Sequence, residues 1–342
     1  MLKASLIFLT YNQETFVQEA IVSVLNQDYE NIEIIISDDG STDQTLAIIE
    51  RTVSAHPRGA TAVFLPKEVN MGLVKNWNRA VKAATGEILI AAAGDDISEP
   101  TRASSLVKIF EADSGVMATF SQVCIIEASG QVLHETFEKR PPKYSHHVRA
   151  DSRTGFNFWC GVPILGACGA YRRELSEVFG PITDAHSEDE PYIYRALLLG
   201  AVVYTPKNLV LWRWHGLNLS AGSLTDESDA SETLTKMAAM SVRRIDACRQ
   251  HTKDLQTAHS LGYLGDKDRC LEMRTIDSLM SIHRLSFHTL SPQSSIWAWI
   301  KAVVDHLSCH QASRQACGHV IRSFIKRIST QKFKLKYSRV IR

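Results

Sequence analysis

An alternation of short apolar runs with helix-like segments over the first hundred residues constrains the fold most strongly. The runs expected to form strands are Ala4–Thr10, Ile32–Ser37, Ala62–Leu65 and Glu87–Ala92. Segments with apolar residues on one helical face separate them: Glu14–Gln27, the stretch that begins at a predicted capping box over Ser41–Gln44, and Asn76–Ala84. Strands that are joined by crossover helices predict a Rossmann-like α/β fold with a doubly wound, mostly parallel sheet.

Polar residues follow three of these predicted strands. They form three pairs: Tyr11 and Asn12, Asp38 and Asp39, and Asp95 and Asp96. In an open parallel sheet the ligand binds outside the carboxyl ends of the strands, so the pattern predicts one shared binding crevice. Carboxylates suit a hard cation such as Mg²⁺ or Mn²⁺. Because the sequence contains no GxxxxGK[ST] motif, a bound diphosphate would need such a metal, with Asp95 as the natural ligand.

The pattern changes after residue 222, where the chain becomes helical and polar. Helices are expected over Asp226–Gln250, Lys267–Leu285 and Ile296–Ile328. We therefore expect a domain over residues 1–222 that contains the sheet and a helical C-terminal region over residues 223–342.

Charge and apolar content limit the partners and the location. The net charge of +1 gives no global field that would favour nucleic acid, and no run approaches the ~20 apolar residues of a membrane span. Seven widely spread cysteines are more typical of reduced thiols in the cytoplasm than of a disulfide framework. Residues 294–342 carry ten Lys or Arg and one acid. This tail is either a solvated segment or a peripheral anchor on the inner face of the membrane.

A set of short motifs runs along the first two thirds of the chain. In order they are TYN at 10–12, SVLNQ at 23–27, SDDGSTD at 37–43, NMG at 70–72, ATGEILIAAAGDD at 84–96, SEDEPYIYRALLLG at 187–200 and WRWHGLNLS at 212–220. The ordered set resembles family 2 glycosyltransferases of the kind that build bacterial surface polysaccharides. Enzymes of this family have the GT-A fold and use a nucleotide-diphosphate sugar. The resemblance covers roughly residues 4–222.

The resemblance also implies roles for individual residues. It predicts a donor site formed by Thr10, Tyr11, Asn12, Asp38, Asp39, Asn70, Gly72, Asn76, Asp95 and Asp96. Asp189 corresponds to the general base, and Asp95 to the metal-binding position, where His215 either joins it as a ligand or contacts the diphosphate. Family members often have an acid two residues before Asp95, where this chain has Ala93.

Chemistry leads to the same expectation. Transfer of a sugar to an alcohol requires a base that accepts the hydroxyl proton, and a single displacement by one base inverts the anomeric carbon. The basic tail and the resemblance, rather than the chemistry, lead us to expect a glycan or lipid-linked acceptor. Two alternatives stay open: a catalytically inactive sugar-nucleotide binder, and a sugar nucleotidyltransferase, although TYNQET lacks the glycine and basic residues that grip a triphosphate.

Overall fold

The computed structural model describes residues 1–66, 69–134, 148–151, 165–216, 218, 230–291 and 294–309. The chain forms two compact units, Met1–His215 and Gly216–Arg342, and each is considered by itself. The boundary predicted at residue 222 lies outside the described residues, so the division of functions between the two predicted domains stays a prediction.

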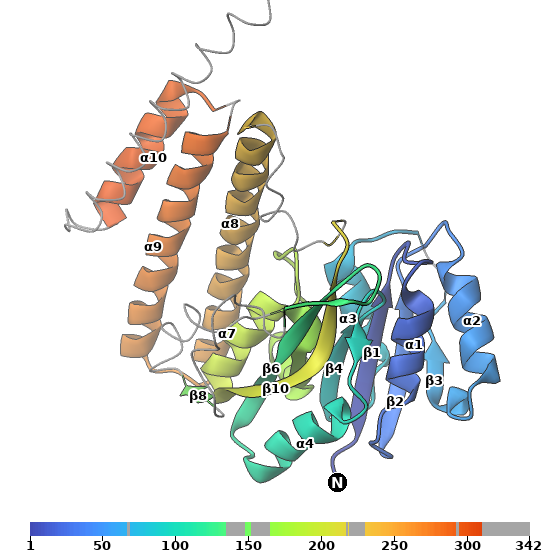
Figure 1. Cartoon of the computed structure of the whole chain (residues 1–342). Coiled ribbons are helices and arrows are strands. Elements are labelled where there is room, and N and C mark those ends of the chain that lie inside the picture. Colours follow the sequence, from blue (N-terminus) through green and yellow to red (C-terminus); the bar gives the residue numbers. More distant parts are fainter. Residues whose placement is uncertain are drawn as a thin grey trace, which may run out of the picture. The chain divides into compact units, whose positions relative to one another are not determined.

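Four parallel strands form one half of the sheet in the N-terminal unit. They are β1 (Ala4–Thr10), β2 (Ile32–Asp38), β3 (Ala62–Phe64) and β4 (Ile88–Ala93), in the order β3-β2-β1-β4 (Figure 1). Thr10 pairs with Asp38 at the carboxyl end of the β1–β2 ladder, which brings the first two predicted polar clusters together. The helices between these strands are α1 (Val17–Leu25), α2 (Thr45–Ala55) and α3 (Leu73–Ala83).

The other half of the sheet mixes strand directions. Its strands are β5 (Ile97–Ser98), β6 (Val116–Glu127), β7 (Val132–His134), β8 (Val148–Asp151), β9 (Gly169–Arg172) and β10 (Ala201–Trp214). The order continues β4-β9-β6-β10-β5, with β9 antiparallel to both neighbours and β10 parallel to β6. The predicted doubly wound α/β class is confirmed, and antiparallel β9 is an addition that the sequence pattern did not indicate.

Helices cover both faces of this sheet, which explains why β1 is buried along its whole length. Leu6 and Phe8 pack into the core shared with α1, α2 and α4 (Arg102–Ala112). Ile7 and Leu9 point the other way, into the core shared with α3, α6 (Glu174–Phe179) and α7 (Asp189–Leu199). Side chains of a strand alternate between faces, so a strand covered on both sides has apolar residues on both faces, here Leu6 to Leu9.

The C-terminal unit consists of helices in the part of it that the structure describes. These are α8 (Ala230–Ser260), α9 (Asp266–Leu290) and α10 (Ile296–Cys309). Leu285 of α9 packs against Trp299 and Ala302 of α10, and the Trp299 indole donates a hydrogen bond to Thr289 Oγ1 at 3.1 Å. Among the described helices, none combines the length and the apolar composition that crossing a bilayer requires. The basic tail beyond Cys309 lies outside the described residues.

A carboxylate network closes the amino-terminal edge of the sheet. Glu33 of β2 accepts hydrogen bonds from Ser5 Oγ at 2.5 Å, from the Thr85 N–H at 2.7 Å and from Lys3 Nζ at 3.1 Å. Burial alone would raise the pKa of Glu33, but these donors outweigh it and lower the pKa to about 2. The ionised form of Glu33 therefore ties β1, β2 and the segment before β4 together.

The substitution Glu33→Gln should destabilise the fold by about 1–3 kcal/mol at pH 7, because several donors lose a charged acceptor. A lowered folded-state pKa gives stability that is present above the unfolded pKa of 4.5 and is lost as the pH falls toward about 2. Urea unfolding at pH 7, 4 and 3 should thus show the gap between wild type and variant shrinking with acid. The exposed Glu50→Gln serves as control, and a gap that stays constant with pH would contradict this account.

Candidate active site

The loops that follow β1 and β2 are bonded to each other by side chains and backbone. The Asn12 N–H donates to Ser41 Oγ at 2.8 Å, and Asn12 Oδ1 accepts from the Thr42 N–H at 2.8 Å. Asn12 has a positive φ of 49°, a conformation that asparagine tolerates better than most residues. The N–H of Asp39 donates to the Thr10 carbonyl at 2.9 Å. These bonds make the two loops one wall of the carboxyl edge.

Asp38 is buried in this wall and is fully occupied by its neighbours. It accepts hydrogen bonds from the Ser41 N–H at 2.8 Å, from Ser41 Oγ at 2.5 Å and from Thr10 Oγ1 at 2.9 Å. Its side chain therefore shapes the loop from within. These three hydrogen bonds stabilise the Asp38 carboxylate from within the protein.

Asp39 is also buried and holds the loop before α3. Its two carboxylate oxygens accept from the N–H of Met71 at 2.8 Å and of Gly72 at 2.9 Å. Gly72 has a φ of +86°, which favours glycine at this turn. The predicted donor residues at 70–72 are thus brought to the β2 edge. If Asp39 contacts a nucleotide, it does so while its carboxylate also accepts these two hydrogen bonds.

A buried amide and an arginine support the same edge from α3. Asn76 Nδ2 donates to the Ser37 carbonyl at 2.9 Å, and Ser37 Oγ donates to Asn76 Oδ1 at 2.6 Å. Arg79, which we did not single out from the sequence, donates from Nη2 to the Asp38 carbonyl at 2.9 Å. Its position one helical turn after Asn76 was the only sequence signal that could have indicated it.

The predicted donor residues at this edge differ in how far they are exposed to solvent. Thr10, Asp38, Asp39 and Asn76 are all less than 6% exposed. Tyr11, in contrast, is 45% exposed. The wall therefore has a buried, hydrogen-bonded interior, and Tyr11, Asn12 and Asn70 are exposed at its surface.

The turn after β4 presents the third cluster. Gly94 lies against Thr10 and Gln13, so that a Cβ atom at this position would approach Thr10 Cγ2 to 2.6 Å. Asp96 is buried and accepts a hydrogen bond from the backbone N–H of Arg213 at 2.9 Å. Burial raises the pKa of Asp96 well above its usual range, the negative charge of Asp95 adds to this, and the bond from Arg213 offsets it only in part. Asp96 thus joins the turn to β10 from inside.

Asp95 faces a histidine at the end of β10. The distance from Asp95 Oδ2 to His215 Nε2 is 3.0 Å, and Phe16 lies over the imidazole with ring centroids 4.8 Å apart. Asp95 and His215 are thus brought together as the resemblance implied, whereas Phe16 was not foreseen.

The pair fits a divalent metal that is shared with a substrate. Two neighbouring ligand atoms of an octahedral ion at about 2.1 Å lie roughly 3 Å apart, which is the separation of these two side chains. No group of three or more His, Cys, Asp or Glu side chains able to hold a metal occurs among the described residues. Ala93, at the end of β4, supplies no ligand. Phosphate oxygens and water would have to complete the coordination, as is usual for Mg²⁺.

The predicted base, Asp189, is the first residue of α7 and lies beside a second carboxyl group. Its Oδ1 accepts from the Glu190 N–H at 2.8 Å, as acids at a helix N-terminus commonly do. Burial raises the pKa of Asp189, and hydrogen bonds from Ser187 and from backbone N–H groups, including that of Gly166, lower it only in part.

Glu188 is the more deeply buried carboxyl group of this pair. Burial and the charge of Asp189 raise the pKa of Glu188 to about 8, so Glu188 holds its proton at neutral pH. Asp189 accepts more hydrogen bonds from N–H groups than Glu188 does. Gly166, in the short helix η2 (Gly166–Cys168), approaches the Glu188 carboxyl group so closely that a Cβ would collide with it.

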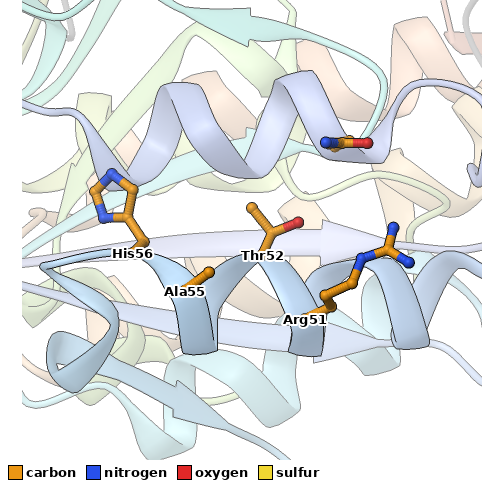
Figure 2. A pocket seen from close by; sticks show the side chains of 5 residues that line it. Arg51, Thr52, Ala55 and His56 are labelled. Carbon is orange, nitrogen blue, oxygen red and sulfur yellow. The ribbon is translucent and has the colours of Figure 1, made fainter.

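A shallow groove on the same unit contains none of these residues. It has a volume of about 300 Å³ and is lined by Gln18 of α1 and by Arg51, Thr52, Ala55 and His56 of α2 (Figure 2). No carboxylate lies in it, so the groove does not belong to the predicted donor site.

Comparison with known proteins identifies the family. Residues 5–179 match glycosyl transferase family 2. An uncharacterized glycosyltransferase of Nostoc sp. is 30% identical over 278 residues, which are 80% of this chain and 81% of that protein. The GalNAc(5)-diNAcBac-PP-undecaprenol beta-1,3-glucosyltransferase of Campylobacter jejuni is 30% identical over 151 residues, 44% of this chain and 47% of its own.

Solved structures show the same fold at lower identity. S. aureus TarS 1–349, in complex with UDP-GlcNAc, has a TM-score of 0.52 at 16% identity, and the match covers 92% of both chains. The mannosyltransferase PcManGT of Pyrobaculum calidifontis, in complex with GDP-Man and Mn²⁺, has a TM-score of 0.50 at 16% identity over 96% of this chain and 87% of its own. The chain therefore has the GT-A fold and belongs to glycosyltransferase family 2, the enzymes that transfer a sugar from a nucleotide-sugar donor.

Proposed function

We propose that this glycosyltransferase inverts the anomeric centre, and that Asp189 is its general base. The observation that carries the proposal is the buried Glu188–Asp189 pair, in which the pKa of Glu188 is raised to about 8. A protonated Glu188 leaves Asp189 as the only charged member, and the raised pKa of Asp189 makes it a stronger base than an exposed aspartate.

The donor would lie along the carboxyl edge of β1, β2 and β4. We propose that exposed Tyr11 stacks on the nucleotide base, and that Asn12, Asn70 and Gly72 border the sugar-phosphate. Buried Thr10, Asp38, Asp39, Asn76 and Asp96 hold these loops in place. Neighbours with this fold bind UDP-GlcNAc or GDP-Man. The candidate donors to test are therefore UDP-, GDP- and dTDP-sugars.

A single displacement accounts for the reaction. The acceptor hydroxyl oxygen forms a bond to the anomeric carbon, the bond from that carbon to the diphosphate oxygen breaks, and the hydroxyl proton passes to Asp189. Mn²⁺ or Mg²⁺, when bound by Asp95 and His215, would stabilise the negative charge of the departing diphosphate. No nucleophilic carboxylate is needed, which distinguishes this route from a retaining double displacement.

We propose a glycan or lipid-linked hydroxyl as the acceptor. The Campylobacter relative is named for an undecaprenol-linked acceptor. The tail over residues 294–342, with ten basic residues and one acid, matches a peripheral contact with anionic lipid on the cytoplasmic face. The bulk of that tail lies outside the described residues, so the proposal rests on its sequence.

The substitution Asp189→Asn should lower kcat by about 10²–10⁴-fold while leaving donor binding nearly unchanged, because the base acts only as the hydroxyl proton is lost. Release of nucleoside diphosphate from UDP-, GDP- and dTDP-sugars, followed with and without a lipid-linked acceptor, measures this. Turnover that survives in the variant would remove Asp189 from the mechanism. A wild type that binds donor without any turnover would favour the inactive sugar-nucleotide binder instead.

The substitution Glu188→Gln should make the fold less sensitive to alkali. A raised folded-state pKa gives stability that is complete below the unfolded pKa of 4.5 and is lost as the pH rises through about 8. Between pH 5 and pH 9, wild type should lose at least about 1 kcal/mol more than the variant, since one pKa unit corresponds to about 1.4 kcal/mol. Urea unfolding with exposed Glu177→Gln as control measures the difference, and parallel pH profiles for wild type and Glu188→Gln would refute the buried-acid interpretation.

A further inference from the structure

Arg213, two residues before His215 on β10, is a buried cation that contacts several separate segments. Its side chain is 2% exposed. Nε donates to the Asp95 carbonyl at 3.0 Å, Nη1 to the Ala128 carbonyl at 2.9 Å, and Nη2 to Glu19 Oε2 at 2.7 Å. Its backbone N–H binds Asp96. One residue thus joins the turn after β4, the β6–β7 turn and α1.

An aromatic ring connects this arginine to the histidine. The Arg213 guanidinium carbon lies 5.0 Å from the centroid of the Phe16 ring, within the range of a cation–π contact. The same ring lies 4.8 Å from the imidazole of His215. Phe16 therefore rests on Arg213 and His215 together, just before the first turn of α1.

These contacts act on both members of the Asp95–His215 pair. Asp95 is held through its own carbonyl, and His215 is held through Phe16 and through its position two residues along β10. Groups that orient a metal ligand or a phosphate-facing side chain from behind affect binding without touching the ligand themselves. A salt bridge alone would not do this, because Glu19 is 65% exposed and exposed ion pairs contribute little.

We propose that Arg213 is the positioning residue of this site: its planar guanidinium keeps Asp95 and His215 in register to receive the metal-bound diphosphate end of the donor. The inference rests on the proposed function, in which that pair faces the diphosphate. It also explains the choice of arginine. Lysine offers one compact ammonium group and cannot address Asp95, Ala128 and Glu19 in one plane while stacking on Phe16.

Three variants separate positioning from folding. Arg213→Gln removes the charge and the planar guanidinium group, whereas Arg213→Lys keeps only the charge. Glu19→Gln removes the ion pair but leaves the hydrogen bonds from Arg213 to the carbonyls of Asp95 and Ala128. Arg51→Gln, an exposed arginine of α2 outside the site, is the matched control. Thermal unfolding of each protein shows whether the fold is intact.

Two readouts report on the site directly. Titration with Mn²⁺ alone, followed by the electron paramagnetic resonance of the free ion, gives the metal affinity. Separate metal-free samples with ¹⁵N-labelled histidine report the hydrogen bond at His215 Nε2, with the signal assigned by its absence in His215→Asn. Both readouts address the pair without requiring turnover.

We expect Mn²⁺ affinity to fall about 10–100-fold in Arg213→Gln and in Arg213→Lys, with a changed His215 signal. Glu19→Gln should weaken affinity by less than about fivefold, as for an exposed ion pair, and Arg51→Gln should have no effect. Folded Arg213 variants with wild-type Mn²⁺ affinity and an unchanged His215 signal would overturn the proposal. If Arg213→Gln does not fold, Arg213→Lys decides in the same way.

Failure of the proposed function looks different. A folded wild type that binds no Mn²⁺, either alone or together with UDP, GDP or dTDP, would contradict the metal-dependent donor site. The His215 signal would still decide whether Arg213 positions the pair, since it is recorded without metal.

Discussion

The hydrogen bonds from N–H and hydroxyl groups to Asp38 and Asp39 are the interaction on which the rest of the site depends. Carboxylates at the end of a buried strand are costly unless donors surround them. Here Ser41 and Thr10 satisfy Asp38, while the N–H groups of Met71 and Gly72 satisfy Asp39. These bonds connect one loop to the next. The two buried carboxylates therefore hold the loops together at the carboxyl edge of the sheet.

Acids in this unit fall into two physical classes. Glu33, Asp38 and Asp39 are surrounded by donors and act in the structure. Asp95 and Asp189, to which we assign functions, each have a titratable neighbour: His215 Nε2 lies 3.0 Å from Asp95 Oδ2, and Glu188, whose pKa is raised to about 8, precedes Asp189. The groups that contact each carboxylate distinguish the two classes better than its position in the sequence does. Asp95 and Asp96 are adjacent, yet Asp96 accepts a hydrogen bond from the backbone N–H of Arg213, whereas Asp95 Oδ2 lies 3.0 Å from His215 Nε2.

Much of the fold followed from the sequence because strand alternation and burial are local patterns. The parallel strands and the helices after residue 230 were indicated by short stretches. The predicted capping box over Ser41–Gln44 was wrong: Ser41 Oγ donates to Asp38, and α2 begins only at Thr45. A hydroxyl next to a buried carboxylate has a better partner there than the helix end offers.

The parts of the site that escaped prediction depend on contacts between distant segments. Arg213 meets Glu19 across 194 positions, and Arg79 meets Asp38 across 41. β9 has only four residues, and its antiparallel direction is set by its pairing with β4 and β6, which are distant in the sequence. Glu188 could be seen as an acid beside Asp189, but its raised pKa arises from burial against Gly166 and is invisible in the sequence.

Binding of a nucleoside diphosphate tests the central claim most directly. Thermal unfolding of the whole chain would be followed with UDP, GDP and dTDP, each with and without Mn²⁺, for wild type and Asp95→Asn. A ligand at 100 times its Kd raises the free energy of unfolding by about 2.7 kcal/mol. We predict stabilisation by one nucleotide, dependent on Mn²⁺ and lost in Asp95→Asn. Folded wild-type protein that none of the three nucleotides stabilises would contradict a donor site at this edge of the sheet.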